Sequence, residues 1–298
     1  MSTAPAQLGL EGMPARLFSC TPTRLTTWQD CPRRYRFNYV DRPTPPKGPP
    51  WAHNSVGSSA HNALRAWWDL PVAYRTPESA GNILERDWLE DGFRDAEQSA
   101  LWRAKVRSMV ESYVATLDPY DEPRGVERVV ATRTDRVAVQ GRVDRIDLRP
   151  VGDSRRELVV VDYKTGRRAP DTHDVRSSLA LALYVLAARR TLREDCNRVE
   201  LHHLPTGRVV AWEHTEESLA RHLRRAEAIA GEASAAEATA KSMSDEAELE
   251  AAFPARPGPQ CGWCDFSRHC SEGRGAADRK KSWAALAQVE HTEVGPGV

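Results

Sequence analysis

Two short polar stretches of this chain contain residues that could bind a metal ion and break a phosphodiester bond. The first is Gly141-Arg-Val-Asp144 and the second is Asp162-Tyr-Lys164. A turn centred on Asp153 would place Asp144 opposite Asp162, because each lies nine residues from that centre. Facing carboxylates at a Cβ separation of about 4.5–5.5 Å repel each other, and a divalent cation removes that repulsion. Lys164 lies on the same strand face as Asp162, so the set predicts metal-dependent phosphodiester cleavage.

The residues around these stretches predict the strands that position them. From Val137 to Val143, valines alternate with Ala138, Gln140 and Arg142, which is the period of a half-buried strand. Residues 158–161 form a continuous apolar run, as expected of a central strand covered on both faces. The simpler alternative to a metal site is that these charged residues are solvated at the ends of ordinary strands. The two acidic ends in hairpin register favour a site, and so does a lysine in a chain with only six lysines.

The remaining periodicity indicates helices and strands in alternation. Helices are expected over 21–39, 55–69, 77–98, 99–117, 175–192 and 215–240, and strands over 126–133, 136–148, 157–164, 197–204 and 208–214. The sequence has no Gly-x4-Gly-Lys-Ser/Thr phosphate loop, which argues against an ATP-driven motor of that class.

Composition places the chain among soluble globular proteins. It has 298 residues, of which 40% are hydrophobic, and its net charge is zero. No apolar run approaches the ~20 residues of a membrane span and the start lacks a signal-peptide core, so no membrane association and a cytoplasmic location are expected. Zero net charge argues against strong nonspecific attraction to nucleic acid, although arginines gather around residues 33–42.

Three of the six cysteines have the spacing of a metal site. Cys261-x2-Cys264-x5-Cys270 lies near the end of the chain, and Cys31 precedes a proline near its start. Zinc and iron–sulfur clusters both take four thiolates, so spacing alone leaves both open. The other two, Cys20 and Cys196, are expected to be free and buried.

The order of these motifs resembles the RecB-type branch of the PD-(D/E)xK nucleases. It runs Gly57-x3-His61, Gly141-x2-Asp144, Asp162-x-Lys164 and then a helix that contains Tyr184. The cysteine motifs look like the iron–sulfur staple of AddB-like members of that branch and of the CRISPR-associated exonucleases. The resemblance covers about residues 21–270. One departure is Ala180, which stands where the family often places a glutamine four residues before the tyrosine.

This resemblance implies a restriction-endonuclease-like α/β fold, with a mixed sheet flanked by helices, an N-terminal helical subdomain and a C-terminal iron–sulfur staple. A single nuclease domain is expected over residues 16–275, between disordered segments 1–15 and 276–298. Within it, the helical subdomain spans about 50–120, the catalytic sheet about 125–215, and the cluster-binding segments lie near 31 and 261–270.

The resemblance also implies roles for individual residues. Asp144, Asp162 and Lys164 resemble the catalytic set, and Lys164 would orient the attacking water. His61, the two aspartates and the backbone carbonyl of Tyr163 would bind Mg²⁺ or Mn²⁺. Cys31, Cys261, Cys264 and Cys270 would hold a 4Fe–4S cluster, and Tyr184, Arg145, Arg33 and Arg34 are candidates for support of the site or contact with substrate.

The function implied is that of a metal-dependent DNA exonuclease acting on single-stranded ends in DNA repair or recombination, with a helicase or other repair protein as a possible partner. A catalytically weak DNA-binding or helicase-partner module is the alternative, favoured by Ala180 and the zero net charge. A zinc-stapled RNA-processing protein is a third reading.

Overall fold

The computed structural model describes residues 17–152, 155–242 and 245–287. The strands are β1 (Phe18–Cys20), β2 (Gly125–Arg133), β3 (Val137–Val151), β4 (Arg155–Lys164), β5 (Cys196–His203) and β6 (Arg208–Glu213). The helices are α1 (Pro22–Asp30), α2 (Pro32–Tyr39), α3 (Ala52–Trp68), α4 (Pro77–Arg86), α5 (Ala96–Val114), α6 (Thr172–Ser177), α7 (Leu179–Leu192), α8 (Glu216–Ser242), α9 (Glu246–Ala252) and α10 (Ser271–Ala276). Short 3₁₀ turns are η1 (Val72–Tyr74), η2 (Pro259–Trp263) and η3 (Ser267–His269).

All the strands belong to one mixed sheet, organised around the long strand β3. β2 runs antiparallel along one edge of β3. On the other edge, β1 pairs in parallel with residues 137–139, and β4 pairs antiparallel from Arg145 onward. The sheet continues through β5 and β6. Residues 140–144 therefore lie between the two partners of that edge, and this opening in the sheet contains Asp144.

Strand β4 is covered on both faces, as its continuous apolar run predicts. Val159 and Val161 belong to a core shared with α3, α4 and α5. Leu158 and Val160 point to the other face and belong to a core shared with α7. Since alternate residues face opposite sides of a strand, only a central strand buried on both sides needs apolar residues at every position.

Helix α3 packs on the sheet through an amphipathic stripe. Val56, Ala60, Ala63 and Leu64 are buried at the spacing of one helical face. His61 follows directly after Ala60 and stays partly exposed beside this stripe. Packing of α3 on the sheet therefore brings His61 to the strand ends.

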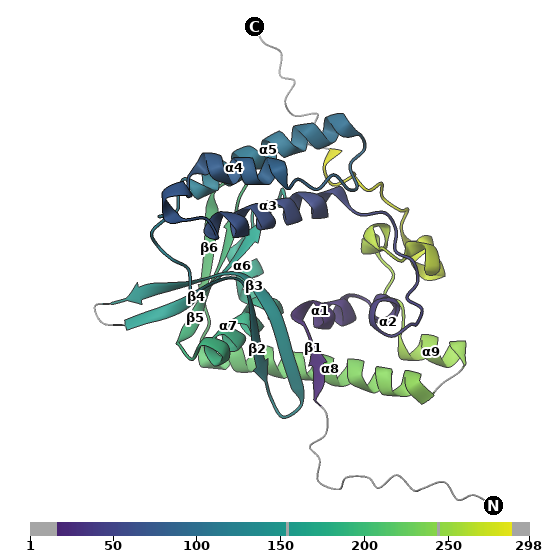
Figure 1. Ribbon diagram of the computed structural model, residues 1–298. Helices are drawn as coiled ribbons and strands as arrows, with labels where there is room; N and C mark the ends of the chain where they lie inside the picture. Colours follow the sequence, from purple (N-terminus) through teal and green to yellow (C-terminus); the bar gives the residue numbers. More distant parts are fainter. Residues whose placement is uncertain (1–16, 153–154, 243–244, 288–298) are drawn as a thin grey trace, which may run out of the picture.

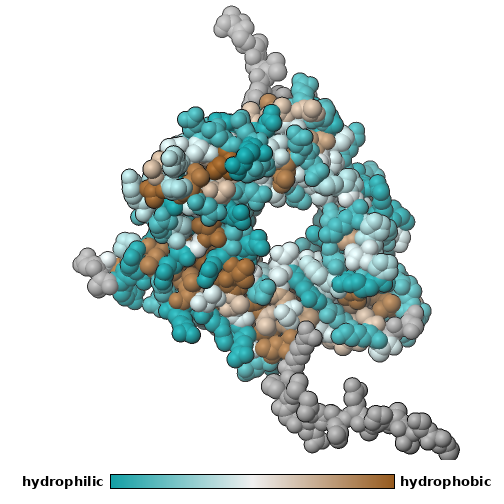
Figure 2. Space-filling view, in the orientation of Figure 1, coloured by the Kyte–Doolittle hydropathy of each residue, from teal (hydrophilic) through white to brown (hydrophobic). Residues whose placement is uncertain are grey.

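The chain closes into a ring (Figure 1). Helices α3, α4 and α5 form one side, the sheet the next, and α1, α2 and α8 the third. The segment after α9, coloured yellow-green, completes the ring. Figure 2 shows an opening through the middle of the molecule in the same view.

Three sequence predictions are corrected by the structure. The helix expected over 21–39 is two helices, because Cys31 is extended (φ −165°) before Pro32, as residues that precede proline commonly are. The helix expected over 77–98 ends at Arg86, and a loop with Gly92 at φ +84° follows. The helix expected over 175–192 is also two helices, α6 and α7, because Ser178 between them is extended (ψ 110°). Strand β1 and helices α9 and α10 were not predicted.

The expected C-terminal disorder is wrong for residues 276–287. Leu286 is 5% exposed, and the backbone N–H groups of Ala52 and Lys280 donate to the carbonyls of Ser282 and Gly262. The predicted disorder of 1–15 and of 288–298 lies outside the described residues, as does Asp153. Within the described ranges, no helix combines the length and apolar character needed to cross a membrane.

Candidate active site

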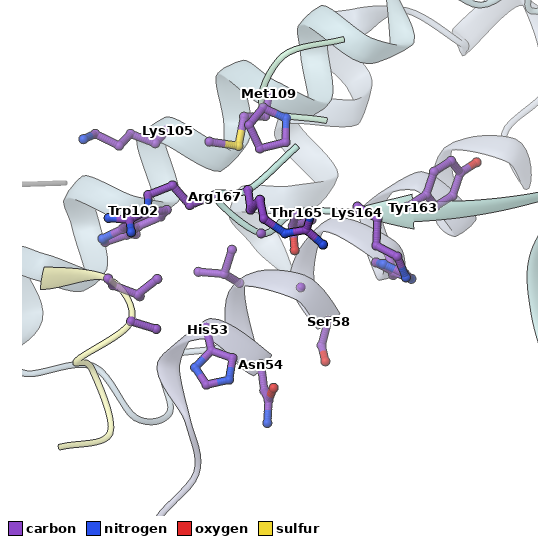
Figure 3. A pocket seen from close by; sticks show the side chains of 18 of the residues that line it. His53, Asn54, Ser58, Trp102, Lys105, Met109, Tyr163, Lys164, Thr165 and Arg167 are labelled. Atoms are coloured by element: carbon purple, nitrogen blue, oxygen red, sulfur yellow. The ribbon is translucent and has the colours of Figure 1, made fainter. Parts of the chain in front are cut away.

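A cavity of about 1230 Å³ lies where α3 and α5 face the ends of the central strands (Figure 3). His61, Glu127, Asp144 and Lys164 line it, from α3, β2, β3 and β4 respectively. The segment 284–286 and Trp263 close its other side. Four separate elements thus bring titratable side chains to one cavity.

The hairpin register places Asp144 as the sequence predicts. Arg145 pairs with Val161, so Asp144 and Asp162 come one step beyond the end of the β3–β4 ladder. The Asp144 Oδ2 accepts a hydrogen bond of 2.8 Å from the backbone N–H of Tyr163. Its Oδ1 lies 3.5 Å from Nδ1 of His61. One oxygen therefore fixes the carboxylate while the other faces the imidazole.

Glu127 is a site residue that the sequence analysis missed. Val126 and Arg128 of β2 pair with Arg145 and Val143 of β3. Glu127, between them on β2, therefore lies beside Asp144 of β3. Its φ of +46° is uncommon for a residue with a side chain. Potential ligand atoms of Glu127, His61 and Asp144 lie within 4.8 Å of one another. Two carboxylates and one imidazole form a mixed oxygen and nitrogen donor set that suits Mg²⁺ or Mn²⁺.

Asp162 is oriented toward Lys164. Its Oδ2 is 2.5 Å from the Lys164 Nζ, and it is not part of the compact group formed by His61, Glu127 and Asp144. Burial raises the pKa of Asp162, the Lys164 ammonium opposes this rise, and the Asp144 carboxylate adds to it. The predicted pair of facing aspartates is therefore present, with one carboxylate beside the lysine and the other beside the histidine.

The electrostatics of the cavity favour a bound cation. Burial raises the pKa of Glu127, and the neighbouring Asp144 raises it further. Burial alone would lower the pKa of His61, but its hydrogen bond to Asp144 and the charges of Asp144, Asp162 and Glu127 raise it above the ordinary value. Both shifts indicate an excess of negative charge, which a divalent cation would relieve.

Tyr163 and Tyr184 lie on either side of the carboxylates. The Tyr163 ring is buried, at 5.7 Å and 85° from the His61 ring. Tyr184 packs against Gly141, where an added Cβ would lie 2.5 Å from the tyrosine Cε1. Burial, together with Asp162 and Asp144, raises the pKa of Tyr184 to about 12. Gly141 is thus needed for close approach of α7 to the site.

Arg145 is buried next to the site and contacts the residues that surround it. It is 3% exposed, and its Nε lies 2.8 Å from Asp147. Its Nη1 donates to the hydroxyls of Tyr113 and Tyr163 at 3.0 and 3.2 Å. Contact of Arg145 with substrate is excluded by this burial.

The buried network continues beyond Arg145 through residues that the sequence analysis did not single out. The Tyr113 hydroxyl lies 2.8 Å from Nδ1 of His202, whose Nε2 lies 2.9 Å from Glu200. Burial alone would raise the pKa of Glu200, but hydrogen bonds from His202, Arg198 and Arg149 hold it below the ordinary value. These side chains form a polar layer under the sheet end.

Arg33, a candidate for support of the site or contact with substrate, is too buried for contact with substrate. Arg33 is 5% exposed, its Nε donates to the carbonyl of Phe253 at 3.0 Å, and its Nη1 is 2.9 Å from Glu250. Arg34 is half-buried and lines the cavity between α2 and the C-terminal cysteines. Both arginines therefore belong to the cysteine end of the protein.

The four clustered cysteines meet at one place. Cys31, Cys261, Cys264 and Cys270 line the same cavity. A Cβ added at Gly273 would lie 3.3 Å from Sγ of Cys270 and 3.5 Å from Sγ of Cys261, so both thiols face this glycine. Cys20 and Cys196 are buried elsewhere, as predicted, and burial raises their thiol pKa values to about 11 and about 12.

The family model of the PD-(D/E)XK nuclease superfamily matches residues 19–271. This range includes His61, Glu127, Asp144, Asp162 and Lys164 and all four clustered cysteines. A search of curated proteins found no significant match.

Proposed function

Because the chain belongs to the PD-(D/E)XK nuclease superfamily, we propose that it is a metal-dependent DNA exonuclease that acts on single-stranded ends in DNA repair or recombination. One observation carries the proposal: His61, Glu127 and Asp144 meet in a cavity that also contains Lys164. A nuclease fold that had lost its activity would have no need to keep buried carboxylates together against their mutual repulsion.

The residues proposed to hold Mg²⁺ or Mn²⁺ are His61, Asp144 and Glu127, with Asp162 and the carbonyl of Tyr163 beside them. A bound divalent cation would lower the pKa of a coordinated water and stabilise charge on the phosphate. Lys164 holds the attacking water and balances charge on the scissile phosphate. Its side chain is 46% exposed, and the Asp162 carboxylate at 2.5 Å orients it.

The ring supports action on single-stranded ends. The cavity is lined by residues of α3, of the ends of β2, β3 and β4, and of the segment after α9, which belong to different sides of the ring in Figure 1. A single strand of DNA enters a closed ring by one of its ends. Cationic side chains line the cavity at Lys105, Lys164, Arg167 and Arg168, which would bind the phosphates of that strand.

We assign the four clustered cysteines to a 4Fe–4S cluster of the AddB-like, RecB-type kind. Tetrahedral zinc with Zn–S bonds of about 2.3 Å requires sulfurs about 3.8 Å apart. Among the described residues, no three of these thiol sulfurs lie within 4.8 Å of one another. This wider spacing favours a cluster over a single ion. The cluster would join α2 to the C-terminal segment and so close the ring.

Cleavage of end-labelled DNA tests the proposal. Anaerobically purified protein with Mn²⁺ should degrade linear single strands, leave circular single strands intact, and act weakly on blunt duplexes. Asp162→Ala should abolish cleavage while DNA binding persists. Binding without cleavage by the wild-type protein would overturn the nuclease proposal in favour of a DNA-binding or helicase-partner module. Preferential cleavage of RNA would overturn the assignment of substrate.

A further inference from the structure

Aromatic side chains gather at the end of the cavity that contains no proposed metal ligand. His53, Trp102 and Trp263 line the cavity there. Figure 3 shows His53 and Trp102 on the side of the cavity away from Lys164 and Tyr163. Trp263 is 37% exposed, although it is a large apolar side chain. The mechanism of cleavage uses none of these residues.

Trp263 is held firmly while part of its surface stays accessible. Its ring lies 5.2 Å from that of Trp51 and 5.8 Å from that of His53, the latter edge-to-face at 83°. Trp51 is itself fixed, because its Nε1–H donates to Asp265 at 2.7 Å. A rigid, partly exposed indole is a suitable surface for stacking of a planar ring.

Two polar atoms beside this indole have no hydrogen-bond partner among the described residues. They are the buried Nε1 of Trp102 and the buried Nδ1 of His53. Trp102 as a whole is 6% exposed. A buried polar group without a partner is destabilising, so an ordered water is expected beside each of these atoms at the edge of the cavity. Burial lowers the pKa of His53, although Asp265 opposes this, so the imidazole is neutral at pH 7 and has one donor and one acceptor.

We propose that this end of the cavity is a subsite for one unpaired nucleobase, which stacks on Trp263 between His53 and Trp102. The inference rests on the proposed function, and it identifies the substrate group that the site recognises. An aromatic face matches a base, and Lys105, whose Nζ lies 5.8 Å from the centre of the Trp102 ring, would bind the phosphate of the same nucleotide.

The subsite lies a short distance from the metal ligands, so one bound nucleic acid strand would contact both. His53 and His61 are eight residues apart on α3, which is about 12 Å along the helix axis. Trp263 also lies between Cys261 and Cys264, so the cysteine site fixes the residue on which the base stacks.

Binding of a single-stranded oligonucleotide, measured by fluorescence anisotropy in excess chelator to prevent cleavage, tests the subsite. Stacking of one base contributes about 1–3 kcal/mol, so Trp263→Ala should weaken binding about 5- to 150-fold. Trp263→Tyr should retain most of the affinity. Tyr120→Ala, which removes an aromatic ring that is 77% exposed and outside the cavity, is the matched control and should have no effect.

A second oligonucleotide of the same length, composed of abasic nucleotides, separates base stacking from other causes. Wild type and Trp263→Ala should bind it equally well. An equal loss on both oligonucleotides would show that Trp263 acts through phosphate contacts or through integrity of the cysteine site, and would overturn the subsite. Absence of any loss would also overturn it while leaving the nuclease proposal intact. A wild-type protein that neither binds nor cleaves nucleic acid would overturn the proposed function itself.

Discussion

Replacement of Glu127 by glutamine is the most direct test of the candidate metal site, because only the tertiary structure places this residue there. Potential ligand atoms of Glu127 lie within 4.8 Å of those of His61 and Asp144. A cation held among these atoms would lie no farther than 4.8 Å from the Glu127 carboxylate, and at that limiting distance each unit of its charge contributes about 3.5 kcal/mol at an effective dielectric constant of 20. The side chains are 15–29% exposed, so solvent screening reduces this contribution. We therefore expect metal binding to weaken about 10- to 100-fold.

The assay measures the initial rate of cleavage as a function of Mn²⁺ concentration. Glu127→Gln should raise the half-saturating Mn²⁺ concentration about 10- to 100-fold, and the rate at saturation should fall much less. Titration calorimetry with Mn²⁺ checks the same change without turnover. Glu217→Gln on α8, which removes a carboxylate that is 82% exposed, is the matched control and should behave as wild type. An unchanged half-saturating concentration in Glu127→Gln would refute the assignment of Glu127 as a ligand.

Four further predictions follow from the same geometry. Lys164→Ala should reduce turnover about 10²-fold or more with Mn²⁺ affinity retained, and Lys164→Arg should not restore it; near-normal turnover of the arginine variant would make Lys164 an ordinary surface charge. Cys264→Ser should remove a visible absorption shoulder near ~400 nm and lower the midpoint of thermal unfolding, whereas Cys196→Ser should leave the absorption unchanged. Arg145→Met should lower the free energy of unfolding by about 1–3 kcal/mol in denaturant titrations, because the hydroxyls of Tyr113 and Tyr163 lose their buried donor while Asp147 keeps its ion pair with Arg149; an unchanged free energy would contradict this. Neighbouring carboxylates raise the pKa of His61, so protons should compete with Mn²⁺ at a pH above 6.5, the ordinary histidine value, and the half-saturating concentration should increase as the pH falls through this range.

The buried arginines show why a basic sequence stretch does not by itself indicate a binding surface. Arg33 and Arg36 belong to the run of arginines around residues 33–42. Both are buried and pair with acidic residues near α9, Arg33 with Glu250 and Arg36 with Glu246. These partners are more than 200 residues away along the chain. Only the packing of α2 beside α9 pairs them, and no local pattern predicts that contact.

The sequence by itself determined the central hairpin. Asp144 and Asp162 lie at equal distances from the turn, and an apolar run at 158–161 requires a strand buried on both faces. Strand periodicity and hairpin register depend on residues that are close together in the chain, so the local sequence pattern was sufficient to predict this hairpin. The clustered cysteines were also predicted from spacing, although only folding brings Cys31 to the other three.

Tertiary structure alone decided which side chains complete the site. Glu127 is an unremarkable acidic residue in a strand until β2 pairs with β3 and its backbone turns to positive φ beside Asp144. The same holds for the segment 276–287, which is polar and lacks periodicity, yet Leu286 packs into the core next to α3. Each case depends on contacts between segments far apart in the chain. The free energy of such contacts comes from burial and charge pairing across elements, which a linear pattern does not contain.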